Sequence, residues 1–129
     1  MLKKFVFYTG ASDYLVGLAT WGGAIQIAML PPDKGRFVPL ITLGTFLLMA
    51  AACLVWASRD LEKRAPVVFW QGLVRLSAIA AVLYAVPNAM SETWEYGLLA
   101  IDGPIGLTYV IGSMRITGKS FFDLLLCRE

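Results

Sequence analysis

The chain has no histidine among its 129 residues, and this absence argues against several kinds of active site. Histidine is the usual axial ligand of haem, a frequent metal ligand, and the base that activates many serine and cysteine nucleophiles. A redox enzyme working on its own is therefore not expected. No cofactor and no metal ion are predicted.

Cysteine and nucleotide-binding signals are also scarce. The two cysteines, Cys53 and Cys127, lie in an apolar run and in the charged C-terminal segment, with no metal-type spacing. No glycine-rich phosphate loop follows a strand-like segment, and the net charge of +2 comes from residues that flank apolar runs. Neither a disulfide, a nucleotide site nor nucleic-acid binding is predicted.

Charge is scarce as well, because apolar residues fill the chain. Charged residues make up 16% and hydrophobic residues 58% of it, and the mean hydropathy is +0.69. Crossing a hydrocarbon core takes roughly 17–25 predominantly apolar residues. Four runs satisfy this length, at residues 5–30, 37–57, 67–87 and 96–114. The sequence therefore predicts an all-α fold in which residues 1–114 form a four-helix transmembrane bundle.

The basic residues outside these runs are unevenly distributed. Short loops make neighbouring helices antiparallel, so the flanking segments alternate between the two sides of the membrane. By the positive-inside rule, the side richer in lysine and arginine is cytoplasmic, which places both termini in the cytoplasm. The short loops and compact four-span layout carry no organelle address, which favours a bacterial inner membrane. These residues are also expected to contact anionic lipid. One side has Lys3, Lys4, Arg59, Lys63, Arg64, Arg115, Lys119 and Arg128, and the other has Lys34 and Arg36.

Residues 115–129 follow the last apolar run and are too short and too charged to cross a membrane. Apolar side chains such as Phe121 and Leu124 alternate there with charged ones such as Lys119 and Asp123. This pattern predicts a short amphipathic helix that lies along the cytoplasmic interface or docks a partner.

Three charged residues interrupt the apolar runs, and we refer to Asp13, Arg75 and Asp102 as the intramembrane triad. A charge at bilayer depth costs at least roughly 2.5–3.5 kcal/mol, so it normally faces a partner or a polar cavity. At about 1.5 Å per residue, Asp13 and Arg75 lie level with each other and Asp102 lies within reach of the arginine. The triad is the candidate catalytic group. A purely structural role, fixing the register of the helices, is the alternative.

Polar and small residues recur at helical spacing around the triad. Thr20 shares a face with Asp13, Tyr109 with Asp102, and Gln71 with Arg75. In lipid these stripes are expected to face the bundle interior, so Thr20, Gln71 and Tyr109 are candidate ligand contacts.

The loop between the last two runs offers further candidates. Asn88, Glu92 and Trp94 cluster there and would rim the mouth of a cavity. The alternative is a solvated loop in which Trp94 anchors the chain at the membrane interface.

Two groups of small membrane proteins are similar in layout. Four spans, an acid followed by glycine at Asp102-Gly103, and a short basic tail resemble the DoxX-like bacterial membrane proteins. Small multidrug resistance transporters are similar in length and carry an acid in their first span, where this chain has Asp13. Those transporters use glutamate there and lack a buried arginine in the third span. The basic asymmetry also disfavours their dual topology.

Three functions follow from these features. The first is an accessory or assembly subunit of a membrane complex, which needs no cofactor and uses partner subunits or further copies of the chain. The second is a protein that binds, isomerises or cyclises a lipophilic small molecule, with Asp13 or Asp102 as acid or base and Arg75 beside them. The third is a small proton-coupled transporter that uses one of the same acids.

Overall fold

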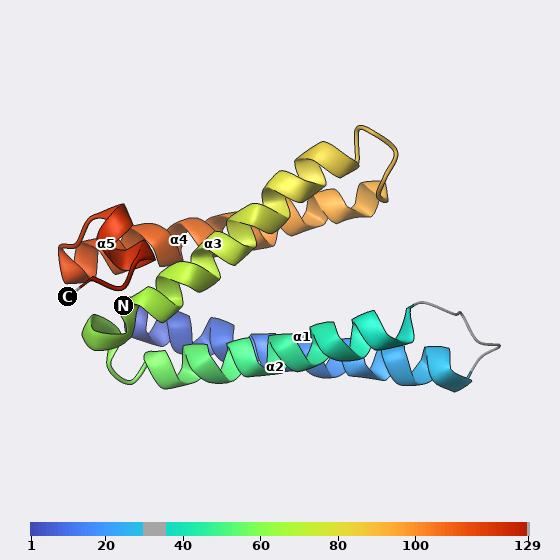
Figure 1. The fold of residues 1–129 in the computed structure, drawn as a ribbon, viewed down its shortest axis with the longest axis horizontal. Coiled ribbons are helices and arrows are strands. Elements are labelled where there is room, and N and C mark those ends of the chain that lie inside the picture. Colours follow the sequence, from blue (N-terminus) through green and yellow to red (C-terminus); the bar gives the residue numbers. More distant parts are fainter. Residues whose placement is uncertain (30–35, 129) are drawn as a thin grey trace. The chain divides into compact units, whose positions relative to one another are not determined.

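The computed structural model describes residues 1–29 and 36–128, and every regular element in these ranges is a helix (Figure 1). The all-α prediction is confirmed for this part of the chain. Most of the turn expected between the first two runs lies outside the described residues. The elements are α1 (Leu2–Met29), α2 (Phe37–Ala57), α3 (Leu61–Ala85), the 3₁₀ turn η1 (Thr93–Glu95), α4 (Tyr96–Thr117) and α5 (Phe121–Leu125).

Three of these segments are long and apolar enough to cross a membrane, as an integral membrane protein requires. They are Phe37–Ala57, Leu61–Ala85 and Thr93–Thr117, with mean hydropathies of 2.3, 1.6 and 1.3. The remaining long helix, α1, has 28 residues and hence the length to cross. It is not among the three, since glycine, threonine, glutamine and Asp13 interrupt its apolar run.

The predicted boundary of α2 matches the structure, whereas α3 begins earlier than expected. The third apolar run was expected to begin at residue 67, but the charged segment before it is already helical, and Leu61–Arg64 form the first turn of α3. Glutamate, lysine and arginine are good helix formers. The negative charge of Glu62 near the N-terminus of α3 also interacts favourably with the helix dipole. At the same end of the α3–α4 hairpin, α4 continues to Thr117 and is closed by Gly118, whose φ of 67° is left-handed.

The chain divides into two compact units, Met1–Arg59 and Asp60–Glu129. In the first unit, α1 and α2 form an antiparallel hairpin with closely approaching backbones. A Cβ added at Gly10 would lie 2.8 Å from the Cβ of Leu54, and the ring of Trp21 covers Gly44. The Trp21 indole N–H also donates to the Ile41 carbonyl at 3.3 Å. Small residues thus allow the close helix contact that is typical of membrane helices.

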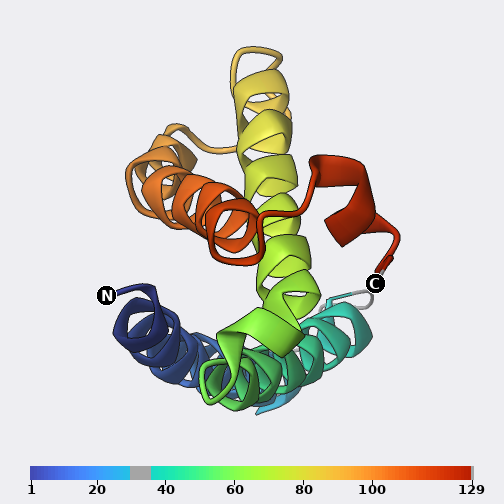
Figure 2. The ribbon, with the colours of Figure 1, turned by 90° about the vertical axis from the view of Figure 1, so that its left-hand side faces the viewer.

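The second unit contains α3, η1, α4 and the C-terminal tail. After α4 the chain turns back so that α5 lies beside α3 (Figure 2). Leu124 is fully buried in a cluster with Ala65, Phe69 and Val110. The indole N–H of Trp70 donates to the carbonyl of Leu125 at 3.2 Å. The tail therefore docks on its own helical hairpin, through contacts that a sequence pattern does not reveal.

The start of α5 is fixed by a capping box. Asp123 donates its backbone N–H to the Ser120 hydroxyl, and its carboxylate accepts from the hydroxyl and backbone N–H of Ser120. The hydroxyl bond, then the backbone bond, then the charges of Arg128 and Lys119 lower the pKa of the Asp123 carboxyl. Phe122 and Leu126 stay exposed at 68% and 55%, which leaves an apolar edge on the tail.

Candidate functional site

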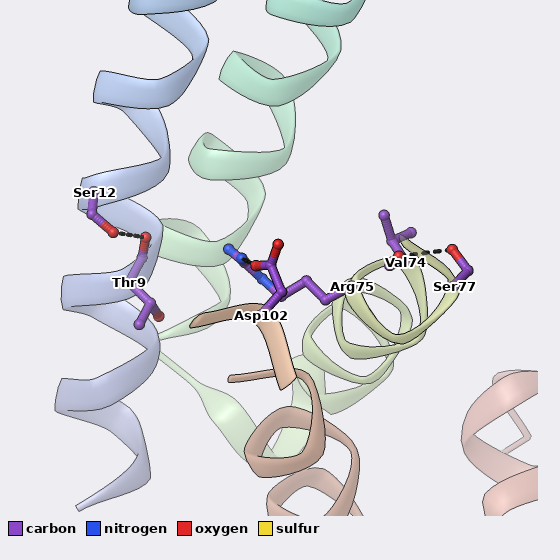
Figure 3. Close-up of polar contacts among 6 residues, drawn as sticks. All are labelled: Thr9, Ser12, Val74, Arg75, Ser77 and Asp102. Atoms are coloured by element: carbon purple, nitrogen blue, oxygen red, sulfur yellow. Dashed lines mark hydrogen bonds and ion pairs between the residues drawn. The ribbon is translucent and has the colours of Figure 1, made fainter. Parts of the chain in front are cut away.

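The structure pairs Arg75 in the middle of α3 with Asp102 in α4. The Nη1 group of Arg75 donates to Oδ1 of Asp102, forming both a hydrogen bond and an ion pair (Figure 3). The two side chains are only 15% and 18% exposed. A charge-assisted hydrogen bond in such surroundings is much stronger than one in water, because little solvent screens it.

Two glycines set the position of this pair. A Cβ added at Gly72 would lie 2.9 Å from the carbonyl oxygen of Gly106, so the backbones of α3 and α4 touch there. The helices are antiparallel, so one turn onward from Gly72 to Arg75 corresponds to one turn back from Gly106 to Asp102. The close approach therefore holds the arginine opposite the aspartate.

Tyr109 closes the pair on one side. Its ring centroid lies 5.9 Å from the guanidinium carbon of Arg75, and its side chain is fully buried. A cation over an aromatic face contributes about 0.5–2 kcal/mol, with the larger value where water is excluded. The sequence suggested Tyr109 as a ligand contact, and the structure shows it packed against Arg75.

Several hydroxyl groups on α1, α3 and α4 bond to carbonyls of their own helices. Thr20 donates to the Val16 carbonyl at 2.9 Å, and Thr108 donates to that of Pro104 at 2.7 Å. Figure 3 shows the same arrangement for Ser77, which donates to Val74 at 2.7 Å. A hydroxyl satisfied in this way can face lipid or a packed neighbour without a polar cavity. The hydroxyl of Thr20, bonded in this way, is therefore not by itself evidence for a shared polar interior.

The other predicted site residues belong either to the first unit or to other parts of the second unit. Asp13 and Thr20 belong to α1 in the first unit, so a partnership of Asp13 with Arg75 stays a prediction. In the second unit, Gln71 lies half-buried on α3. The loop residues Asn88, Glu92 and Trp94 follow the end of α3, which is about 15 Å along the helix from Arg75 at 1.5 Å per residue.

The loop residues Asn88, Glu92 and Trp94 are exposed. The Asn88 side chain donates to the Tyr84 carbonyl at 2.6 Å, Trp94 is 71% exposed, and Glu92 is exposed. No residue of this loop is brought to the ion pair. A hollow of about 330 Å³ on α4 is likewise lined by residues 107, 108, 111, 112 and 115 and not by the pair.

One residue of this unit was missed by sequence reasoning. Gly72 was not assigned a role, although a glycine facing Gly106 across an antiparallel hairpin is what close packing requires. The hydroxyl of Ser113 is buried, with the residue 2% exposed, and has no hydrogen-bond partner among the described residues. Within the same ranges, no three acidic, cysteine or histidine side chains gather in a way that would hold a metal ion.

Comparison with protein-family models, curated proteins and solved structures gives no match to this chain. The resemblances in layout noted above therefore stay expectations.

Proposed function

We propose that this protein crosses a bacterial inner membrane four times, with both termini in the cytoplasm, and serves as an accessory or assembly subunit of a larger membrane complex. The three apolar segments and the basic asymmetry of eight residues against two support this topology. A subunit of this kind contributes helices and needs no cofactor of its own.

The packing of α1 supports its role as the fourth span. Its contacts with α2 run from Gly10 opposite Leu54 to Trp21 opposite Gly44, over much of the length of α2. With 28 residues, α1 is about 42 Å long at 1.5 Å per residue, against a hydrocarbon core of about 30 Å. If α2 spans the membrane, a helix packed along it crosses the same depth.

The main support for the accessory role is that Arg75 and Asp102 bond to each other within the contact between α3 and α4. The pair is mostly buried, lies one turn from the glycine contact, and has Tyr109 against the guanidinium. A catalytic acid needs access to its substrate, whereas the carboxylate of Asp102 is bonded to Arg75 within the helix contact. The arrangement therefore favours a structural role, in which the ion pair fixes the two helices to each other, and not a catalytic role.

The outer faces of the same hairpin are apolar and available to other helices or to lipid. Exposed side chains there include Val74 at 49%, Leu83 at 54%, Ile101 at 61% and Leu107 at 51%. Association of membrane helices depends on such surfaces through close packing.

A pair of neutral substitutions tests the role of the ion pair. Removing one partner of a buried pair costs about 3–5 kcal/mol because the other charge is left uncompensated, while replacing both costs much less. We expect Arg75→Gln and Asp102→Asn each to destabilise the hairpin and to reduce the amount of native-sized complex. The double variant, in which two amides can still bond, should recover most of the hairpin stability and most of the native-sized complex. Ser77→Ala serves as the control, because Ser77 is exposed and bonds to its own helix.

The same variants separate the proposal from the alternatives. If Asp102 takes part in binding or converting a lipophilic molecule, or in proton-coupled transport, the double variant will be folded but inactive. Cross-linking within native membranes provides the second test. Recovery of only a single chain or a homo-oligomer would contradict the accessory role.

A further inference from the structure

A basic hollow lies at one end of the α1–α2 hairpin, within the first unit. It has a volume of about 460 Å³ and is lined by Lys3, Lys4, Phe7, Tyr8, Ser58 and Arg59. Lys3 and Lys4 lie in the first turn of α1, and Ser58 and Arg59 directly follow α2. The antiparallel hairpin brings these two segments together, and Figure 1 shows the start of α1 and the end of α2 at the same end of the unit.

The lining carries three positive charges and no negative one. Lys3, Lys4 and Arg59 are exposed, and their side chains form no ion pair or hydrogen bond with any residue in the described ranges. The next acid in the chain, Asp60, lies 3.8 Å from Lys63. Three cations converging on one hollow repel one another, so an anion placed among them is favoured.

The remaining lining residues give the hollow a floor and an apolar wall. Ser58 is only 3% exposed, and its hydroxyl donates to the Val55 carbonyl at 2.7 Å, so it is part of the packed end of α2. Phe7 and Tyr8 are 44% and 68% exposed, and their rings meet edge to face at 5.6 Å. A ligand that fits this hollow therefore has an anionic group with an apolar group next to it.

The position of the hollow identifies the anion. Arg59 follows α2 by two residues, and α2 is the most apolar of the three candidate spans, so the hollow lies at the level of the lipid headgroups. We infer that the hollow binds the phosphate of an anionic phospholipid, with Lys3, Lys4 and Arg59 on the phosphate and Phe7 and Tyr8 beside the glycerol and upper acyl chain. This inference rests on the proposed membrane placement of α2 and is independent of the accessory role.

A defined site differs from diffuse attraction to a charged surface in a measurable way. Each lysine or arginine near an anionic surface contributes about a fivefold factor in binding, so three contribute on the order of a hundredfold. In diffuse attraction any three cations contribute equally. In a site, the three that line the hollow contribute most of the effect.

Native mass spectrometry of the full chain in detergent micelles tests this directly. The probes are phosphatidylglycerol and phosphatidylcholine with identical acyl chains. We expect one phosphatidylglycerol per chain to bind in preference to phosphatidylcholine. The triple variant Lys3→Gln, Lys4→Gln, Arg59→Gln should lose most of that preference, on the order of a hundredfold.

A matched triple variant serves as the control. Lys63→Gln, Arg115→Gln and Arg128→Gln remove the same charge from exposed positions outside the hollow and should keep the preference within about threefold. Lys3→Arg with Lys4→Arg should also keep it, because the charges remain. Equal losses in the two glutamine triples, or no preference for phosphatidylglycerol in the parent chain, would overturn the inference.

The source of the phosphate is tested by adding excess inorganic phosphate. Bound phosphatidylglycerol should stay bound, because the apolar wall holds only the lipid. Displacement by inorganic phosphate would overturn the lipid assignment and show that the hollow takes free phosphate. Since the isolated chain is measured, loss of partner subunits does not affect the result. Evidence against the accessory role would therefore leave the lipid-binding inference unchanged.

Discussion

Replacing Gly72 by alanine is expected to separate α3 from α4. The new Cβ would lie 2.9 Å from the carbonyl oxygen of Gly106, 2.9 Å from Cγ2 of Val110 and 3.0 Å from Cβ of Tyr109. The Gly106 oxygen and Tyr109 Cβ cannot turn away by changing a rotamer, since one is a backbone atom and the other is fixed to it. The helices must therefore move apart by several tenths of an ångström, which also loosens the Arg75–Asp102 pair one turn away.

Overpacking of this kind costs about 1–3 kcal/mol, partly offset by the roughly 1 kcal/mol that alanine gains over glycine in a helix. Gly103→Ala is the matched control, because its added Cβ would meet only Cδ1 of Ile79 at an ordinary 3.5 Å. Reversible unfolding in mixed micelles should show Gly72→Ala less stable than Gly103→Ala by about 1–3 kcal/mol. Equal stability of the two variants would refute the close backbone contact.

Further predictions concern the tail, the ion pair and the first hairpin. Leu124→Ala should destabilise the docked tail by about 2–5 kcal/mol and expose it to limited proteolysis, with the exposed Leu126→Ala as the control. Because the folded-state pKa of Asp123 is lowered, its capping contribution is present above the ordinary aspartate pKa of about 3.9 and is lost as pH falls through the lowered value. The indole N–H resonance of Trp70 should therefore shift only in strong acid, and Asp123→Asn should abolish that transition. The single variants Arg75→Gln and Asp102→Asn should each be less stable than the double variant, and the free energies of unfolding of the three variants would show this. Trp21→Phe should weaken the α1–α2 hairpin by about 1 kcal/mol through loss of the bond to Ile41, and unchanged stability would mean that water replaces it.

Much of the helical layout could be predicted from sequence, because hydropathy reports where a chain can be buried in lipid. The bounds of α2 and the reach of Arg75 to Asp102 follow from apolar length and from the rise per residue. The early start of α3 could not be read in this way. The first turn of α3 is mostly charged, so hydropathy does not mark it as helical, although its residues are good helix formers.

The details of packing depend on which helices meet, and no single apolar run records this. Gly72 has a role only because Gly106 faces it, and Leu124 is buried only because Phe69 and Val110 form its site. The hydrogen bonds of the polar stripes could not be predicted for a related reason. Periodicity shows where a hydroxyl such as that of Thr20 lies on a helix, but not that its bond goes back to Val16 on the same helix.

The docked tail has a consequence for the order of folding. The site of Leu124 combines Ala65 and Phe69 from α3 with Val110 from α4, so it exists only after the two helices have packed. Until then Leu124 has no packed site to enter. Docking of the tail therefore depends on the packing of α3 against α4.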